Sequence, residues 1–152
     1  MPLHGEYVPS PREHVRRQVE EFESSDGTRG HLMRGYPIVV ITMRGARSGT
    51  LRKVPLMRVE HDGTWAVVAS MGGAPTHPLW YHNLKAPPEA IVQDGARRVE
   101  VLARELEGEE RTAWWERAVA AFPDYADYQR KTDRLIPVVL LEPVPPVRDP
   151  AP

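Results

Sequence analysis

The chain has 152 residues, enough for one domain with a core of its own. It is 41% hydrophobic and 27% charged, its formal net charge is −1, and it has no cysteine. The absence of cysteine excludes disulfides, thiolate nucleophiles, iron–sulfur clusters and cysteine-based zinc sites. The near-zero net charge argues against a general polyanion binder. No apolar run approaches the roughly 20 residues of a transmembrane helix, and no secretory signal pattern is visible, so we expect a cytoplasmic location.

Residues 10–22 have the pattern of an amphipathic helix. Val15, Val19 and Phe22 fall on one face, and Ser10 is the expected N-cap. We interpret this segment as a packing helix that covers one end of the fold. A lid or a helix lying on a membrane surface is the alternative.

Six short segments rich in β-branched residues or with alternating polarity predict strands. They are Pro37–Met43, Lys53–Glu60, Trp65–Ser70, Glu89–Gln93, Arg98–Leu106 and Ile136–Leu141. Asp-Gly pairs at 62–63 and 94–95 each predict a hairpin between consecutive strands. Pro55 lies inside the second segment, which therefore belongs at an edge or contains a bulge.

Two more helices are expected, a short one in His77–Lys85 and a longer one over Glu109–Ala121. Sequential hairpins without regular strand–helix alternation favour a mainly β fold, an antiparallel barrel with peripheral helices (α+β), over a doubly wound sheet. We divide the chain into an N-terminal helix and linker (1–30), a barrel domain (31–143) and a disordered proline-rich tail (144–152).

The loop Arg44–Lys53 is basic and contains two glycines. Residues 37–60 carry a net charge of +4, in contrast to the chain as a whole. Glycines expose backbone N–H groups, and Ser48 and Thr50 add hydroxyls. The guanidinium groups of arginine can donate two parallel hydrogen bonds to a phosphate. The loop therefore predicts binding of an anionic group such as a phosphate, with a solvated hairpin loop as the alternative.

Small residues follow one of the predicted strands, in Ala69–Pro75. A flat ring could approach the main chain there, and Ser70 could bond to ring carbonyls; a plain strand-to-helix connection is the alternative. Aromatic, amide and cationic side chains gather in the next segment. His77 and His82 are five residues apart, which does not match the i, i+4 zinc geometry, so no metal site is expected.

Tyr125 and Tyr128 share one face of a helix, because they are three residues apart. Two phenols on one face could line a pocket and donate to a carbonyl or nitro oxygen. Two half-buried tyrosines on a packing helix are the alternative. A serine hydrolase is a poor fit, since neither Ser48 nor Ser70 lies in G-x-S-x-G. The basic loop has no interleaved aromatic residues, so no nucleic-acid partner is expected.

Taken together and in this order, three stretches resemble the deazaflavin (coenzyme F420)-dependent nitroreductase and quinone reductase family of actinobacteria. They are Thr42–Leu56, Ala69–Pro88 and Tyr125–Pro137, and the likeness covers roughly residues 38–143. The resemblance implies a split β-barrel of the FMN-binding-like type. It also implies hydride transfer from reduced F420, a planar ring with an acidic phosphate and glutamate tail, to a quinone, nitroaromatic or enone.

The resemblance also assigns roles to individual residues. The cofactor-binding residues of the first stretch are Arg44, Arg47, Ser48, Gly49, Arg52, Lys53 and Pro55, of which Arg47, Ser48, Arg52 and Lys53 would hold the phosphate and tail. Those of the second stretch are Ser70, Met71, Gly72, Gly73 and Ala74 beside the ring, and His77, Trp80 and Asn83 along the groove. The catalytic or substrate-lining residues are Tyr125 and Tyr128.

The sequence departs from the family pattern at two positions. Met71 stands where relatives often have lysine, and Phe122 stands where the best-studied nitroreductases have a third tyrosine. Quinone reduction is therefore the safer expectation than nitroimidazole reduction. The alternatives are an FMN- or haem-binding split-barrel protein and a non-enzymatic F420 carrier. A homodimer and a peripheral membrane contact through a quinone substrate are further expectations.

Overall fold

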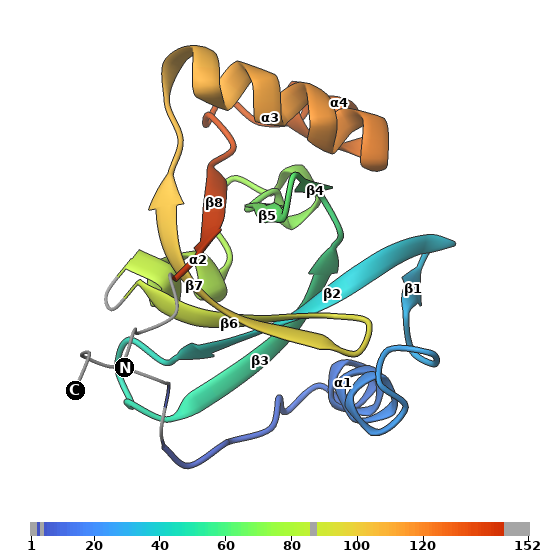
Figure 1. Cartoon of the computed structure of the whole chain (residues 1–152). Helices are drawn as coiled ribbons and strands as arrows, with labels where there is room; N and C mark the ends of the chain where they lie inside the picture. The colour runs from blue at the N-terminus through green and yellow to red at the C-terminus, as the bar shows by residue number, and fades with distance from the viewer. Residues whose placement is uncertain (1–2, 4, 86–87, 145–152) are drawn as a thin grey trace, which may run out of the picture.

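The computed structural model describes residues 3, 5–85 and 88–144. In this part of the chain the strands form one curled antiparallel sheet, the predicted barrel (Figure 1). The strands are β1 (Leu32–Met33), β2 (Tyr36–Arg44), β3 (Leu51–Met57), β4 (Glu60–His61), β5 (Thr64–Val68), β6 (Glu89–Asp94), β7 (Arg97–Glu105) and β8 (Val138–Pro143). Their order is β1-β2-β6-β7-β8-β5-β4, and β3 pairs with β2 alone.

Four α-helices and one short 3-10 helix accompany the sheet in the described residues. They are α1 (Glu13–Ser24), η1 (Met71–Gly73), α2 (Leu79–Lys85), α3 (Gly108–Ala121) and α4 (Asp124–Arg130). Figure 1 shows α3 and α4 stacked over one side of the barrel and α1 near the β2–β3 face on the other. None of the described helices combines the length and the apolar character that crossing a bilayer requires.

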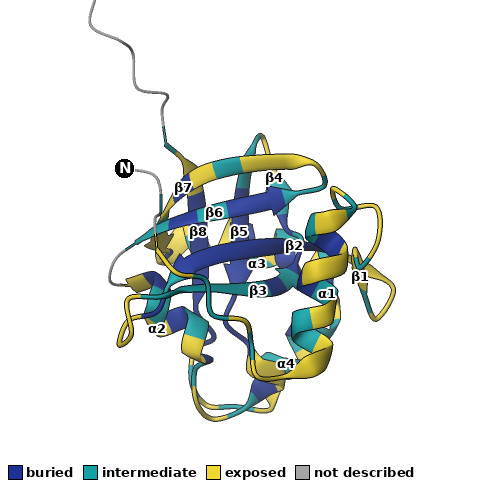
Figure 2. Ribbon diagram, turned by 90° about the horizontal axis from the view of Figure 1, so that it is seen from below, coloured by how far each residue is buried: buried dark blue, intermediate teal, exposed yellow. Residues whose placement is uncertain are grey.

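Apolar side chains pack on both faces of β2, which explains its continuous apolar run. Val39, Ile41 and Met43 belong to a core inside the barrel, to which β5, β6, β7 and β8 also contribute. Ile38 and Val40 face a second core, which α1, α3 and α4 cover. Figure 2 shows β2 as a buried band with α1 lying beside it.

The prediction that the Pro55 strand lies at an edge is confirmed, because β3 has only β2 as a ladder partner. Residues of the N-terminal segment pair with the other side of β3 at its first residue. The Val8 amide donates to the Leu51 carbonyl at 3.0 Å, and the Leu51 amide donates to the Glu6 carbonyl at 2.8 Å. The chain thus shields this end of its own sheet edge.

The first hairpin turn is as predicted, with positive φ at both Asp62 (52°) and Gly63 (77°). The predicted start of the first helix is wrong. Ser10 Oγ accepts a hydrogen bond from the Arg12 amide at 3.2 Å, but Arg12 is itself extended and the helix begins at Glu13. Of the predicted disordered tail, residues 145–152 lie outside the described residues.

Candidate functional site

The basic loop between β2 and β3 is a closed turn. The Gly45 amide donates to the Thr50 carbonyl at 2.7 Å, and the hydroxyls of Ser48 and Thr50 are 2.7 Å apart. The Ala46 amide donates to Asn83 Oδ1 at 2.9 Å, so α2 is attached to the loop. Asn83 therefore holds the loop in position, whether or not it also contacts a cofactor.

The cations of this loop do not all point to one place. Arg52 pairs with Met43 across the ladder and shares its face, whereas Lys53 points to the opposite face. Lys53 Nζ lies 2.5 Å from a carboxylate oxygen of Glu23 on α1. Arg47 and Arg52 have no carboxylate within ion-pair distance among the described residues. The structure thus leaves these two guanidinium groups available to an anion.

The small-residue corner after β5 contains three consecutive residues with positive φ: Met71 (46°), Gly72 (65°) and Gly73 (83°). Positive φ strains Met71, which lacks glycine's freedom. A Cβ on Gly73 would lie 2.7 Å from the Tyr128 carbonyl oxygen and 3.0 Å from the Lys131 Cβ. The corner therefore lies directly against α4, and glycine is required at 73 for that contact.

Arg134 holds the corner from the other side, and the residue-by-residue assignment missed this role. Its guanidinium donates to the carbonyls of Ala69 (3.0 Å), Ser70 (2.6 Å) and Ala74 (2.8 Å), and lies 3.0 Å from His77 Nδ1. Burial, followed by the nearby Arg134 charge, lowers the pKa of His77. Because a guanidinium can only donate, Nδ1 must accept, which places the proton of neutral His77 on Nε2.

The two predicted tyrosines differ in environment. Tyr125 is 4% exposed and belongs to the second core, and burial raises the pKa of its phenol. Tyr128 is half-buried, and its hydroxyl oxygen accepts a hydrogen bond from Arg34 Nη1 at 2.9 Å. Arg34 Nη1 also lies 3.3 Å from a carboxylate oxygen of Asp124. For Tyr125 the packing interpretation therefore holds, and Tyr128 is the accessible phenol of the pair.

The aromatic neighbourhood of Phe122 includes a phenol from another element. The Tyr36 ring stands edge-on to the Phe122 ring, with centroids 5.1 Å apart. Phe122 is also 5.0 Å from Tyr125 and 6.0 Å from Tyr128, centroid to centroid. The position of the missing third tyrosine thus lies inside an aromatic cluster that still contains hydroxyl groups.

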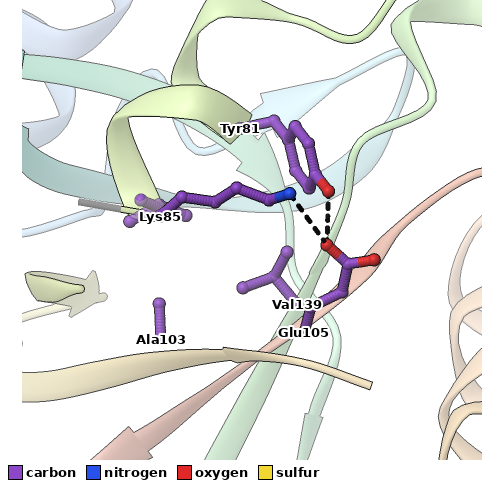
Figure 3. Close-up of a pocket in the computed structure, with 6 residues that line it drawn as sticks. Tyr81, Lys85, Ala103, Glu105 and Val139 are labelled. Carbon is purple, nitrogen blue, oxygen red and sulfur yellow. Dashed lines mark hydrogen bonds and ion pairs between the residues drawn. The ribbon is translucent and has the colours of Figure 1, made fainter. Parts of the chain in front are cut away.

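A pocket of about 150 Å³ lies at the α2 end of the barrel (Figure 3). Its lining residues are Tyr81, Leu84, Lys85, Ala103, Glu105 and Val139, none of which is among the predicted contacts. Tyr81 donates to Glu105, and Lys85 Nζ lies 3.8 Å from the same carboxylate. Burial, with this hydrogen bond, raises the pKa of Tyr81. Typical ligand sites have roughly 300–1,000 Å³, so this pocket is too small for a tricyclic ring.

Among the described residues, no group of three or more His, Asp or Glu side chains is arranged to hold a metal ion. Two parts of the candidate site are fixed by contacts: the small-residue corner lies against the backbone of α4 at Tyr128, and the basic loop is attached to α2 through Asn83. Together with the curled antiparallel sheet, they define a split-barrel protein with candidate binding elements for a planar, anionic ligand.

The chain belongs to the F420H(2)-dependent quinone reductase family, whose model matches residues 14–143. This is an oxidoreductase family with coenzyme F420 as its cofactor, so the resemblance seen in the sequence is confirmed. The F420H(2)-dependent quinone reductase Rv1261c of Mycobacterium tuberculosis is 32% identical over 124 residues, 79% of this chain and 83% of the relative. Rv3178 of the same organism is 35% identical over 107 residues, which make up 70% of this chain and 90% of the relative.

Solved structures agree with this assignment. A structure described as an F420-H2-dependent reductase, FDR-A, is 60% identical, has a TM-score of 0.67, and covers 70% of this chain and 94% of its own. Another, described as a domain-swapped dimer, is 55% identical with a TM-score of 0.70. The match covers 88% of this chain and 100% of that structure's chain. The haem storage protein HutZ of Vibrio cholerae, 12% identical with a TM-score of 0.54, covers 86% and 90% and shares the fold alone.

Proposed function

We propose that this protein reduces a quinone with reduced F420, and that nitroaromatics and enones are secondary acceptors. The observation that carries the proposal is the packing of α4 on the glycine corner, where the missing Cβ of Gly73 leaves room for the Tyr128 backbone. This contact fixes the backbone of the residue that carries a half-buried phenol against the segment where small residues allow a flat ring to approach the main chain. We expect the acceptor to bind between this segment and the Tyr128 side chain.

The residues present fit the cofactor. Two guanidinium groups without carboxylate partners in the described chain, those of Arg47 and Arg52, suit a phosphate and carboxylate tail. The corner Ser70–Ala74 would take the ring, and Arg134 keeps that corner in shape through its carbonyls. Lys53 supports the site indirectly, because its ion pair with Glu23 fixes α1 over β3.

When bound, the reduced deazaflavin supplies a hydride. The chain's own residues hold the tail, shape the ring corner and present a phenol to the acceptor. Tyr128 is the assigned proton donor; Tyr125 supports it by packing, since its ring centroid lies 6.3 Å from that of Tyr128. No side-chain nucleophile takes part.

Two measurements test the proposal. Titration with F420, FMN and haem, followed by fluorescence or absorbance, identifies the cofactor; micromolar or tighter binding of F420 is expected. Turnover is then followed as oxidation of reduced F420 by menadione, a nitroimidazole and cyclohexenone. Tight binding of FMN or haem without F420 would support the alternative split-barrel functions. Tight F420 binding without oxidation by any acceptor would identify a carrier.

A homodimer is part of the proposal, supported by the 55% identical relative described as a domain-swapped dimer. Light scattering over a range of protein concentrations tests it, and a monomer at every concentration would contradict it. The cytoplasmic location and the peripheral membrane contact remain predictions from the sequence.

A further inference from the structure

We propose that Arg34 is a positioning residue for the proton-donating phenol, and that it selects acceptors whose reduction places negative charge on an oxygen. The inference deepens the proposed function and rests on it. Arg34 lies outside all three stretches that resemble the family, in the turn between β1 and β2. Its side chain nevertheless reaches a residue of α4 that is 94 positions away in the chain.

The local backbone explains how Arg34 reaches α4. Arg34 (φ 51°) and Gly35 (φ 81°) both have positive φ, as in the tight turns that match the twist of a hairpin. The turn carries the arginine out of the sheet toward the start of α4. There its Nη1 lies 2.9 Å from the Tyr128 hydroxyl oxygen and 3.3 Å from Asp124 Oδ2, so one guanidinium group contacts both side chains.

This hydrogen bond determines what the phenol can do. A guanidinium only donates, so Arg34 uses a lone pair of the Tyr128 oxygen and leaves the phenolic proton to point elsewhere. Among the described residues, no side chain or carbonyl accepts that proton. The proton is therefore available to a molecule bound on the side of the Tyr128 hydroxyl that Arg34 does not occupy.

The charges around the phenol favour a negative product. Arg34 faces the oxygen, Lys131 Nζ lies 5.5 Å from the centre of the Tyr128 ring, and Asp124 is paired with Arg34. The core side contributes the neutral rings of Phe122 and Tyr125. Two cations against one paired carboxylate stabilise an oxyanion that forms next to the phenol.

The step that this arrangement serves is balanced. The far carbon of a C=C bond conjugated with the acceptor carbonyl gains a hydride, two electrons and one proton, from the reduced deazaflavin, which is oxidised. The π pair of that C=C bond shifts to form a new double bond to the carbonyl carbon, and the carbonyl π pair moves to the oxygen. That oxygen takes the proton of Tyr128, and the phenolate, held by Arg34, regains a proton from solvent. The substrate class is thus a quinone or enone whose oxygen receives the displaced charge.

The test is a double-mutant cycle in the full chain with F420. The variants are Arg34→Met, Arg34→Gln, Arg34→Lys, Tyr128→Phe and the Arg34→Met/Tyr128→Phe pair. Arg130→Met is the matched control, because Arg130 lies on the same helix and pairs with Asp127 but does not touch the phenol. The measurements are the F420 dissociation constant, and kcat and KM for menadione. A melting curve confirms that each variant folds.

The Arg34→Met variant is expected to lose roughly 10- to 100-fold in kcat, less than removal of a direct oxyanion donor, while its F420 affinity stays within about twofold of wild type. Lysine should restore most of kcat, and glutamine less, because it donates without the charge. In the Tyr128→Phe background, Arg34→Met should change kcat by less than about threefold.

A loss that is equally large with and without the Tyr128 hydroxyl would overturn the inference, as would an Arg34→Met variant that behaves like Arg130→Met. If any Arg34 variant melts early, Asp124→Asn provides the second route, because it keeps the arginine but removes the carboxylate that pairs with it. Its effect on kcat should disappear in the Tyr128→Phe background, and an effect of equal size in both backgrounds would overturn the inference. A wild-type protein that binds F420 but reduces no quinone would instead refute the proposed function.

Discussion

Replacing Gly73 with alanine tests whether the small-residue corner (Ser70–Ala74) and α4 form one structural unit. The new Cβ would lie 2.7 Å from the Tyr128 carbonyl oxygen and 3.2 Å from its Cα, so backbone has to move. Gly72 provides a matched control, because it also has positive φ (65°) but has no heavy atom within 4 Å of the position of its Cβ. The difference between the two variants therefore isolates the contact with α4.

The magnitudes follow from these two observations. Alanine at positive φ costs about 1–2 kcal/mol, and the loss of unfolded-state freedom returns about 0.4–1 kcal/mol. Gly72→Ala should therefore lower the free energy of unfolding by about 1 kcal/mol. The clash at Gly73 adds about 1–3 kcal/mol, for a total near 3 kcal/mol. In a chain of this size that corresponds to roughly 6–12 °C in Tm, against about 2–4 °C for the control.

The assay is urea unfolding and thermal melting of both variants without cofactor, followed by circular dichroism and tryptophan fluorescence. Gly73→Ala should also reduce quinone turnover more than Gly72→Ala, because it displaces Tyr128. Equal losses of stability in the two variants would refute the reasoning, since they would show that α4 does not lie against residue 73 in solution.

Three other changes test the remaining parts of the structure. Arg52→Gln should weaken F420 binding about tenfold and reduce its salt dependence, whereas Lys53→Gln should change F420 affinity by less than about threefold, as titrations at two salt concentrations would show. The pKa of His77 is lowered in the folded state, so the unfolded chain binds more protons below about pH 6.5; wild type should therefore lose stability relative to His77→Gln as the pH falls from 7.5 to 5 in urea titrations, and a constant difference would contradict this. Phe22→Ala should cost about 3–5 kcal/mol in one cooperative transition, because Phe22 is 1% exposed in the core shared with the barrel, and a separate early transition would instead favour an independent N-terminal segment.

The sequence predicts the strands and helices of this fold well, because their signals are local. The continuous run in β2 and the Asp-Gly turn at residue 62 both depend on residues close together in the chain. The wrong start of α1 also comes from reading local signals alone. Ser10 is a residue type that commonly caps helices, but the backbone of Arg12 is extended and the helix begins at Glu13.

The partners of the charged groups could not be predicted in this way. Glu23 neutralises Lys53 across 30 positions, and Arg34 finds Tyr128 across 94. Such pairs exist only once the fold brings the elements together, and many alternatives have the same composition. One feature follows from the strand itself: neighbouring residues of a strand face opposite sides, so Arg52 and Lys53 point to different faces of β3.

The role of Arg134 shows a different limit. Its position within Tyr125–Pro137 is part of the resemblance, but the chemistry of an isolated arginine suggests an anion rather than three main-chain carbonyls. The structure shows that the corner Ser70–Ala74, with its strained backbone, depends on a donor from a distant segment. A site residue can thus act by shaping the backbone that the ligand touches.

The two departures from the family pattern have a common structural feature. Met71 removes a cation from the corner, but the Cβ of Lys131 would lie 3.0 Å from a Cβ on the adjacent Gly73. Phe122 removes a phenol, but the Tyr36 ring stands 5.1 Å from it, centroid to centroid, on a different element. In both cases another element carries a residue of the same chemical kind nearby, and Lys131 Nζ itself lies 5.5 Å from the centre of the Tyr128 ring. We therefore expect the two substitutions to shift acceptor preference rather than to abolish reductase chemistry.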